Sequence, residues 1–132
     1  MNILVISGEF PPFAGGAGTY CNYLVKALAN IGHDVTLITK HYKKNAEHEA
    51  EIDKTLAEQN IKCIRMPYSK FTFMIFWYNT ISAFLKHNKN FNFVILNGDA
   101  AQLVCCKPKL KKRLGKYITI QHGKSAYDLL NK

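Results

Sequence analysis

Two adjacent glycines, Gly15 and Gly16, stand in a loop whose composition suits the binding of a negatively charged group. The loop starts at Ser7, contains Pro11-Pro12, and joins a short branched apolar run to a segment with helical periodicity. Such a loop leaves backbone N–H groups unpaired at a helix N-terminus, where the helix dipole favours an anion. Glycine also lets a ligand approach the main chain, because no Cβ stands in the way. The same glycines would equally serve a tight turn without a ligand, and both interpretations stay open.

Two widespread phosphate-binding motifs are absent from the chain. The G-x-G-x-x-G pattern would need a third glycine three residues after Gly18, where Cys21 stands. The tripeptide at 123–125 reads Gly-Lys-Ser, like the end of a P-loop, but the first glycine of that motif would fall on Ile118. Neither motif therefore accounts for anion binding here.

The chain of 132 residues is one domain at most, and its formal net charge of +9 is unevenly distributed. Cations crowd one short segment: Lys107, Lys109, Lys111, Lys112, Arg113 and Lys116. A run of this kind is usually a solvated helix end, and the alternatives are a surface for anionic lipid headgroups or for nucleic acid. No nucleic-acid-binding motif accompanies the charge, so we expect no nucleic-acid partner.

The cysteines predict neither a metal site nor a disulfide framework. Cys21, Cys63, Cys105 and Cys106 show no C-x-x-C spacing and are not accompanied by paired histidines, so reduced thiols in the cytoplasm are expected. The N-terminus lacks a basic region before its apolar run, which excludes a signal peptide there. The longest apolar stretch, 71–78, is too short to span a bilayer.

Apolar runs alternate with helical periodicity along the chain, which predicts an α/β protein. Strands are expected at 3–7, 34–39, 61–66, 92–97 and 116–121, and helices at 17–31, about 46–59, about 70–87 and 99–106. This alternation favours a parallel sheet with helices on both faces. Tyr20, Leu24, Ala27, Leu28 and Ile31 are expected to form the apolar face of the first helix. The section 40–62 is the most polar, and we expect a surface helix there without a core-facing side.

A strand order of 3-2-1-4-5 would bring the candidate functional residues together. Ligands of such sheets bind beyond the carboxyl ends of the strands, where the order reverses between the first and fourth strands. Three features would meet at that point: Gly15-Gly16, the segment 97–99 (Asn-Gly-Asp) and the segment 121–123 (Gln-His-Gly).

The spaced pattern over the first forty residues resembles the acceptor-side N-terminal domain of family 4 glycosyltransferases, which have the two-domain Rossmann-type B fold. The pattern consists of Pro11-Pro12, Gly15-Gly16, the aromatic Tyr20, and the segment 32–35 (Gly-His-Asp-Val) leading into a strand. The segments 93–99 and 119–123 are similar to the family's fourth strand and to the strand that ends in a cleft histidine. The resemblance runs from residue 1 to about residue 123.

The resemblance implies a metal-free, cofactor-free and retaining transfer of a sugar from a nucleotide-diphosphate donor to a hydroxyl. Gly15 and Gly16 would present N–H groups to the donor diphosphate or sugar, and His122 would act in catalysis by hydrogen-bonding a sugar hydroxyl. Tyr20 and Asp99 would contact the acceptor. Two alternatives stay open: His122 as a turn residue bonded to a neighbouring carbonyl, and Asp99 as a helix N-cap.

The family's donor-binding domain has no counterpart in this sequence, since Glu51 and Glu58 do not have the spacing of its glutamate pair. We therefore expect an incomplete N-terminal domain over 1–132: a fragment, a truncated product, or half of an enzyme whose donor domain is a separate chain. Its expected role is acceptor binding for cell-surface or lipid-linked glycan synthesis, without activity alone. The alternative is a non-catalytic remnant or regulatory module that binds a phosphorylated ligand or a partner protein.

One segment carries too many large apolar residues for a single core-facing stripe: Phe71, Phe73, Met74, Phe76, Trp77, Tyr78, Ile81, Phe84 and Leu85. With the 107–116 cations, they predict peripheral docking on an anionic membrane, at the inner face of the cell membrane. The alternative is that they pack against a part of the protein that is not in this sequence.

Overall fold

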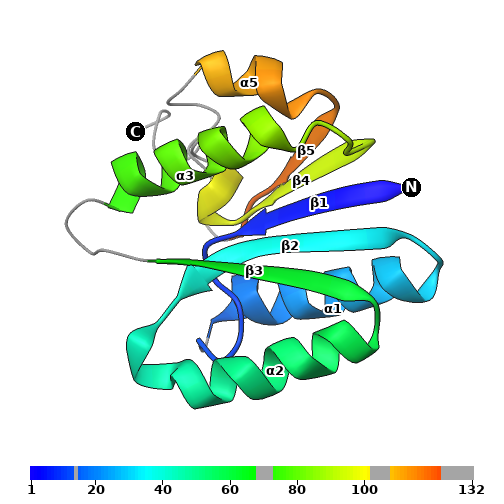
Figure 1. The fold of residues 1–132 in the computed structure, drawn as a ribbon, viewed down its shortest axis with the longest axis vertical. Helices are drawn as coiled ribbons and strands as arrows, with labels where there is room; N and C mark the ends of the chain where they lie inside the picture. The colour runs from blue at the N-terminus through cyan, green and yellow to red at the C-terminus, as the bar shows by residue number, and fades with distance from the viewer. Residues whose placement is uncertain (14, 68–72, 102–107, 123–132) are drawn as a thin grey trace.

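The computed structural model describes residues 1–13, 15–67, 73–101 and 108–122. Five strands form one parallel sheet in the order β3-β2-β1-β4-β5 (Figure 1), which confirms the predicted fold class and strand order. Their bounds are β1 (Asn2–Ser7), β2 (Asp34–His41), β3 (Ile61–Pro67), β4 (Phe93–Asn97) and β5 (Tyr117–Ile120).

Helices cover both faces of the sheet (Figure 1). On one face lie α1 (Gly16–Asn30) and α2 (Ala46–Glu58), the latter preceded by a short 3₁₀ turn η1 (Lys43–Asn45). On the other face lie α3 (Phe73–His87) and α5 (Pro108–Leu114). The helix expected at 99–106 is described only at its first residues, 99–101. No helix of the described residues is long and apolar enough to cross a membrane.

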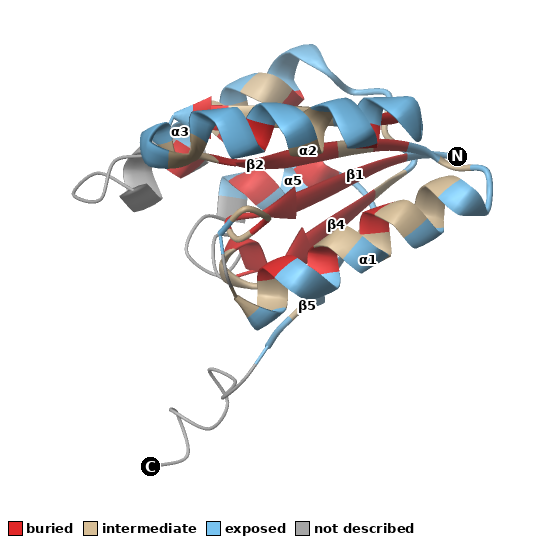
Figure 2. Ribbon diagram, turned by 90° about the horizontal axis from the view of Figure 1, so that it is seen from below, coloured by how far each residue is buried: buried red, intermediate tan, exposed pale blue. Residues whose placement is uncertain are grey.

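The core forms two layers, one on each side of the sheet, with the buried strands between them (Figure 2). β1 alternates between the layers: Ile3 and Val5 face α1 and α2, whereas Leu4 and Ile6 face α3 and α5. Burial on both faces explains the uninterrupted apolar sequence of this central strand.

The predicted apolar face of the first helix is wrong at Tyr20, Ala27 and Ile31, which are all exposed. Tyr20 is 43% exposed and Ile31 is 71% exposed, while Cys21 and Val25 are fully buried. The rotation of α1 is fixed where Gly18 packs on the loop: a Cβ at Gly18 would lie 3.1 Å from the backbone nitrogen of Phe10. The backbone contact turns Tyr20 away from the core.

The polar section does contribute to the core, contrary to expectation. Leu56 of α2 is fully buried and Ile52 packs against the same layer, so two apolar residues four positions apart suffice to dock this helix. Likewise, the cationic run forms helix α5 because Leu110 and Leu114, also four apart, are buried under it.

In α3, Trp77, Ile81 and Leu85 form one buried stripe and Phe84 packs at its edge. These four residues therefore belong to the core and do not form a membrane face. Phe71 and the side chains of Phe73, Met74, Phe76 and Tyr78 lie outside the described part, as do Lys107, Cys105 and Cys106.

Candidate functional site

The carboxyl ends of β1, β4 and β5 are level, because Ser7 pairs with Asn97 and Asn97 with Ile120 in the strand register. β1 and β4 are neighbours, so the order of the sheet reverses there, as predicted. Asn97 and His122 come together at this edge with the first turn of α1. Gly98 lies between the His122 ring and the first turn of α1. A Cβ at Gly98 would be 3.4 Å from the Cβ of Ala17 and 4.0 Å from the His122 ring.

Asn97 is the buried centre of this edge, and its side chain is hydrogen-bonded on both sides. Its Nδ2 donates to Ser7 Oγ at 3.0 Å and to the Ala17 carbonyl at 3.1 Å. Its Oδ1 lies 2.8 Å from Nε2 of His122. A single side chain thus connects the end of β1, the start of α1 and the histidine after β5. Sequence reasoning placed Asn97 at this point as the first residue of the 97–99 segment and gave it no role of its own.

His122 is exposed beyond β5, and its ring packs against Tyr20. The two ring centroids are 4.9 Å apart and the planes meet at 62°, an edge-on contact. The contact joins the aromatic residue of the first-strand loop pattern to the predicted catalytic histidine, across about a hundred residues. Nε2 of His122 is hydrogen-bonded to the side chain of Asn97. The alternative interpretation had expected a neighbouring backbone carbonyl as the partner of this histidine.

The glycine-rich loop ends at α1 without a side-chain cap. Gly15, the N-cap, is extended with φ at −173°, and no acidic residue stands in the first turn. A Cβ at Gly16 would meet nothing within 4 Å among the described residues, whereas one at Gly15 would lie 2.6 Å from Oε2 of Glu9. The space beside Gly16 is therefore open, while a carboxylate stands beside Gly15 at the same positive end of the α1 dipole.

Asp99 is bound to two other strand ends. Its Oδ1 accepts a hydrogen bond from the Gly8 amide at 2.9 Å, and its Oδ2 lies 2.6 Å from Nζ of Lys40. The Lys40 ammonium is itself buried and lies 5.7 Å from the centroid of Trp77. Asp99 thus holds the loop after β1 against β2 and β4, while 26% of its side chain stays exposed.

A buried arginine that sequence reasoning missed holds the proline part of the loop. Arg65 of β3 donates from Nη2 to the Pro11 carbonyl at 2.9 Å and forms a two-nitrogen clamp on Asp53, with distances of 2.9–3.0 Å. Glu49, 3% exposed, accepts from the Tyr42 amide at 2.7 Å and lies 2.5 Å from His41 Nδ1. The available signal was a cation, Arg65, between the apolar residues Ile64 and Met66 of the strand.

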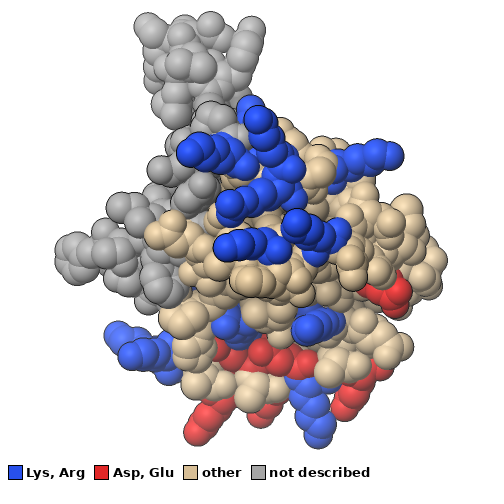
Figure 3. All heavy atoms as spheres, turned by 45° about the horizontal axis from the view of Figure 1, so that its top comes forward, with Lys and Arg blue, Asp and Glu red and all other residues tan. Residues whose placement is uncertain are grey.

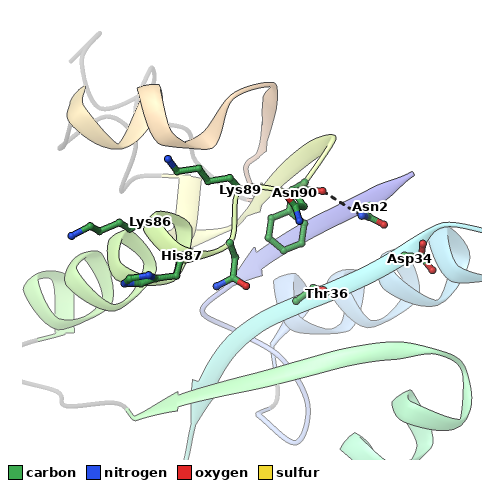
Figure 4. A pocket seen from close by; sticks show the side chains of 9 residues that line it. Asn2, Asp34, Thr36, Lys86, His87, Lys89 and Asn90 are labelled. Atoms are coloured by element: carbon green, nitrogen blue, oxygen red, sulfur yellow. Dashed lines mark hydrogen bonds between the residues drawn. The ribbon is translucent and has the colours of Figure 1, made fainter.

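One hollow of the described surface lies at the opposite edge of the sheet (Figure 4). Asn2 and Asp34, at the beginnings of β1 and β2, line it together with the segment after α3, and Asn2 bonds the Asn90 carbonyl at 3.3 Å. Parallel sheets bind ligands at the carboxyl ends of strands, so this hollow is not the candidate site. Among the described residues, no three His, Cys, Asp or Glu side chains gather in a way that could hold a metal ion.

Comparison with known proteins gave consistent matches. The family model described as Glycosyltransferase Family 4 matches residues 14–130. Glycogen synthase of Myxococcus xanthus (strain DK1622) is 49% identical over 45 residues, which are 33% of this chain and 9% of that protein. Granule-bound starch synthase 2 of Pisum sativum is 40% identical over 57 residues, 41% of this chain and 8% of that protein. The matches thus span less than a tenth of each relative. No solved structure matched.

Proposed function

The chain belongs to glycosyltransferase family 4, and on this premise we propose that it forms the acceptor-side domain of a retaining enzyme that uses a nucleotide-sugar donor. One observation carries the proposal: the open N-terminus of α1, the buried Asn97 and the exposed His122 meet where the strand order reverses. Ligand sites of open parallel sheets lie at this point.

The geometry supports a division of roles within the loop. Gly16 has neither a positive φ nor a neighbour that would exclude a side chain, so its lack of a Cβ benefits a ligand outside the described chain. Its open helix terminus suits the donor diphosphate, on which leaving-group charge develops during transfer. The Glu9 carboxylate repels phosphate at Gly15, which therefore suits sugar hydroxyls better.

His122, in catalysis, would hydrogen-bond a sugar hydroxyl near the reacting carbon. Tyr20 would contact the acceptor, because its half-exposed ring stands beside His122. Asp99 would contribute to acceptor binding mainly by fixing the loop after β1, since both of its oxygens already have partners.

The distribution of charge supports an acceptor at an anionic membrane. Between residues 59 and 127 the sequence holds one acidic residue, Asp99. Apart from Lys62 of β3, the exposed cations of the described residues there belong to α3, α5 and the segments that follow them: Lys86, Lys89, Lys109, Lys111, Lys112, Arg113 and Lys116. Figure 3 shows Lys and Arg side chains gathered on this face, with the acidic side chains in view below them. A lipid-linked or cell-surface glycan acceptor fits such a surface. The glycogen and starch synthases among the relatives make a glucan the other candidate acceptor.

A second domain, in the same or a separate chain, would supply the other wall of the cleft. We therefore expect no sugar transfer and no micromolar binding of nucleotide sugars by residues 1–132 alone. The competing function is a non-catalytic module that binds a phosphorylated ligand or a partner protein. A donor domain encoded directly downstream would favour the enzyme.

Titration of nucleotide sugars into the ¹⁵N-labelled chain tests the proposal, because NMR detects weak binding. We expect amide shifts at Gly16, Ala17, Gly98 and His122, which all belong to one edge of the sheet. Shifts confined to the opposite edge, around Asn2 and Asn90, or none at millimolar ligand, would contradict it. Inorganic pyrophosphate, run in parallel, separates phosphate binding from sugar binding.

A further inference from the structure

The hydrogen-bond partners of Asn97 allow only one orientation of its side-chain amide. The Ala17 carbonyl can accept but not donate, so the Asn97 atom that faces it at 3.1 Å is the NH₂ group. Ser7 Oγ donates its single proton to the Glu9 carbonyl at 2.6 Å, so it must accept from the same NH₂ group. Two backbone carbonyls therefore decide which way the Asn97 amide points.

This orientation fixes the proton on the histidine. The Asn97 oxygen faces His122 at 2.8 Å and can only accept, so Nε2 of His122 carries the hydrogen. Nδ1 of the neutral ring then holds a lone pair and no hydrogen. Because Asn97 is fully buried and held by three hydrogen bonds, its amide cannot reverse without leaving the Ala17 carbonyl without this donor.

We propose that Asn97 is a positioning residue that locks His122 with Nε2 protonated and Nδ1 presented as a hydrogen-bond acceptor. Tyr20 supports the ring from its edge, so both the direction and the protonation of the imidazole are set before a ligand arrives. Where the proposed function holds, the matching ligand group is a donor, a sugar hydroxyl, and not a phosphate oxygen. Nδ1 of His122 would therefore bind a hydroxyl, and the N-terminus of α1 would bind the phosphate.

Long-range ¹H–¹⁵N NMR of the histidine rings tests the lock without any sugar present. In the wild-type chain we expect only the Nε2-protonated form of neutral His122, with a ring N–H that exchanges slowly with water. His48 and His87, which are exposed, serve as internal references. A detectable Nδ1-protonated form of His122 would overturn the proposal, whatever the variants do.

Three variants separate positioning from a merely structural role. Asn97→Asp keeps an oxygen toward Nε2, so neutral His122 should keep its hydrogen on Nε2. Asn97→Leu should release the ring, giving both tautomers and fast N–H exchange. Ser7→Ala, the matched control, removes one partner of the amide but leaves Ala17 to orient it, so His122 should keep the wild-type form.

Retention of the Nε2-protonated form alone in a folded Asn97→Leu chain would contradict the proposal, as would a Ser7→Ala chain that loses the lock. The tautomer of His122 and the titration with nucleotide sugars are independent measurements. A locked ring in a chain that binds no sugar would refute the proposed function alone.

Discussion

Arg65 donates a hydrogen bond to the main-chain carbonyl of Pro11 at 2.9 Å, across the 54 residues that separate them in the sequence. The same guanidinium clamps Asp53 of α2 and its side chain is 7% exposed. The loop that carries Gly15 and Gly16 is thus held by β3 and α2, the two elements that looked least involved in function. Through Asp53, the polar section 40–62 thus helps to hold the loop of the candidate site.

Arg65→Ala should therefore both destabilise the chain and loosen the loop. Asp53 is 32% exposed, but Glu49, 3.5 Å from the guanidinium, is 4% exposed and would lose its buried cation, so we expect a loss of about 3 kcal/mol in urea unfolding. Lys62→Ala, at an exposed position of the same strand, should stay within about 0.5 kcal/mol of wild type. Equal stabilities for the two variants would show that the clamp contributes nothing.

Gly16 and Gly18, at the start of α1, should respond differently to alanine. Gly18→Ala places a Cβ 3.1–3.3 Å from the backbone of residues 9 and 10, and should cost about 1–3 kcal/mol of stability. Gly16→Ala meets open space and should change stability by less than about 1 kcal/mol, yet weaken the NMR response to nucleotide sugars. A Gly16→Ala chain with an unchanged ligand response would remove Gly16 from the site.

His122→Ala should lower kcat about a hundredfold once the chain is joined to a donor domain, the scale of one lost transition-state hydrogen bond. His87→Ala, at the opposite edge of the sheet, should leave turnover near the wild-type value. Near-normal turnover in folded His122→Ala would return this residue to the status of a turn histidine.

The two described thiols should make the fold sensitive to alkaline pH. Burial raises the pKa of Cys21 to about 12, and burial with the nearby Asp53 carboxylate raises that of Cys63 to about 12, from an ordinary 9.0. A raised pKa favours the neutral thiol in the fold, so this stabilisation is complete below pH 9 and is lost as the pH rises toward 12. Each thiol should contribute a slope of about 1.4 kcal/mol per pH unit in that window.

Urea unfolding between pH 8 and 11 measures this slope, and Cys63→Ala should reduce it. Mass spectrometry after alkylation at pH 8 should find both thiols unmodified in the folded chain and modified in denaturant. Equal slopes for wild type and variant, or rapid labelling of the folded chain, would contradict the burial argument.

Membrane docking should depend on the α5 cations and not on net charge alone. Each basic residue near an anionic surface adds about 1 kcal/mol of attraction, so Lys109→Glu, Lys112→Glu and Lys116→Glu together should abolish sedimentation with anionic vesicles. The matched control reverses three exposed lysines of the η1–α2 segment, Lys43, Lys44 and Lys54, and should retain binding. Wild-type binding should be lost at high salt.

Two further outcomes would contradict docking: equal binding to neutral and anionic vesicles, and equal losses for the two triple variants. Trp77, 2% exposed in the core, should show unchanged fluorescence when vesicles are added.

The order of the elements and the edge that carries the site could be predicted because both follow from short-range patterns. Branched apolar runs, helical periodicity and glycine-rich loops can each be recognised from a short stretch of sequence. The rotation of α1, the separate helix α5 and the role of Arg65 could not be, because each depends on a contact made far along the chain. Gly18 against Phe10 turns Tyr20 outward, and Leu110 with Leu114 docks the cationic run.

By itself the sequence determined that this chain alternates strands and helices, that Gly15-Gly16 and His122 follow two strands, and that Asn97 ends a third. Only the tertiary structure decided what those residues do to one another. The direction of the Asn97 amide depends on the Ala17 carbonyl and on Ser7, 80 and 90 residues away. Hydrogen-bond direction is a property of atoms already placed in space, and no spacing along a chain encodes which nitrogen of His122 holds the proton.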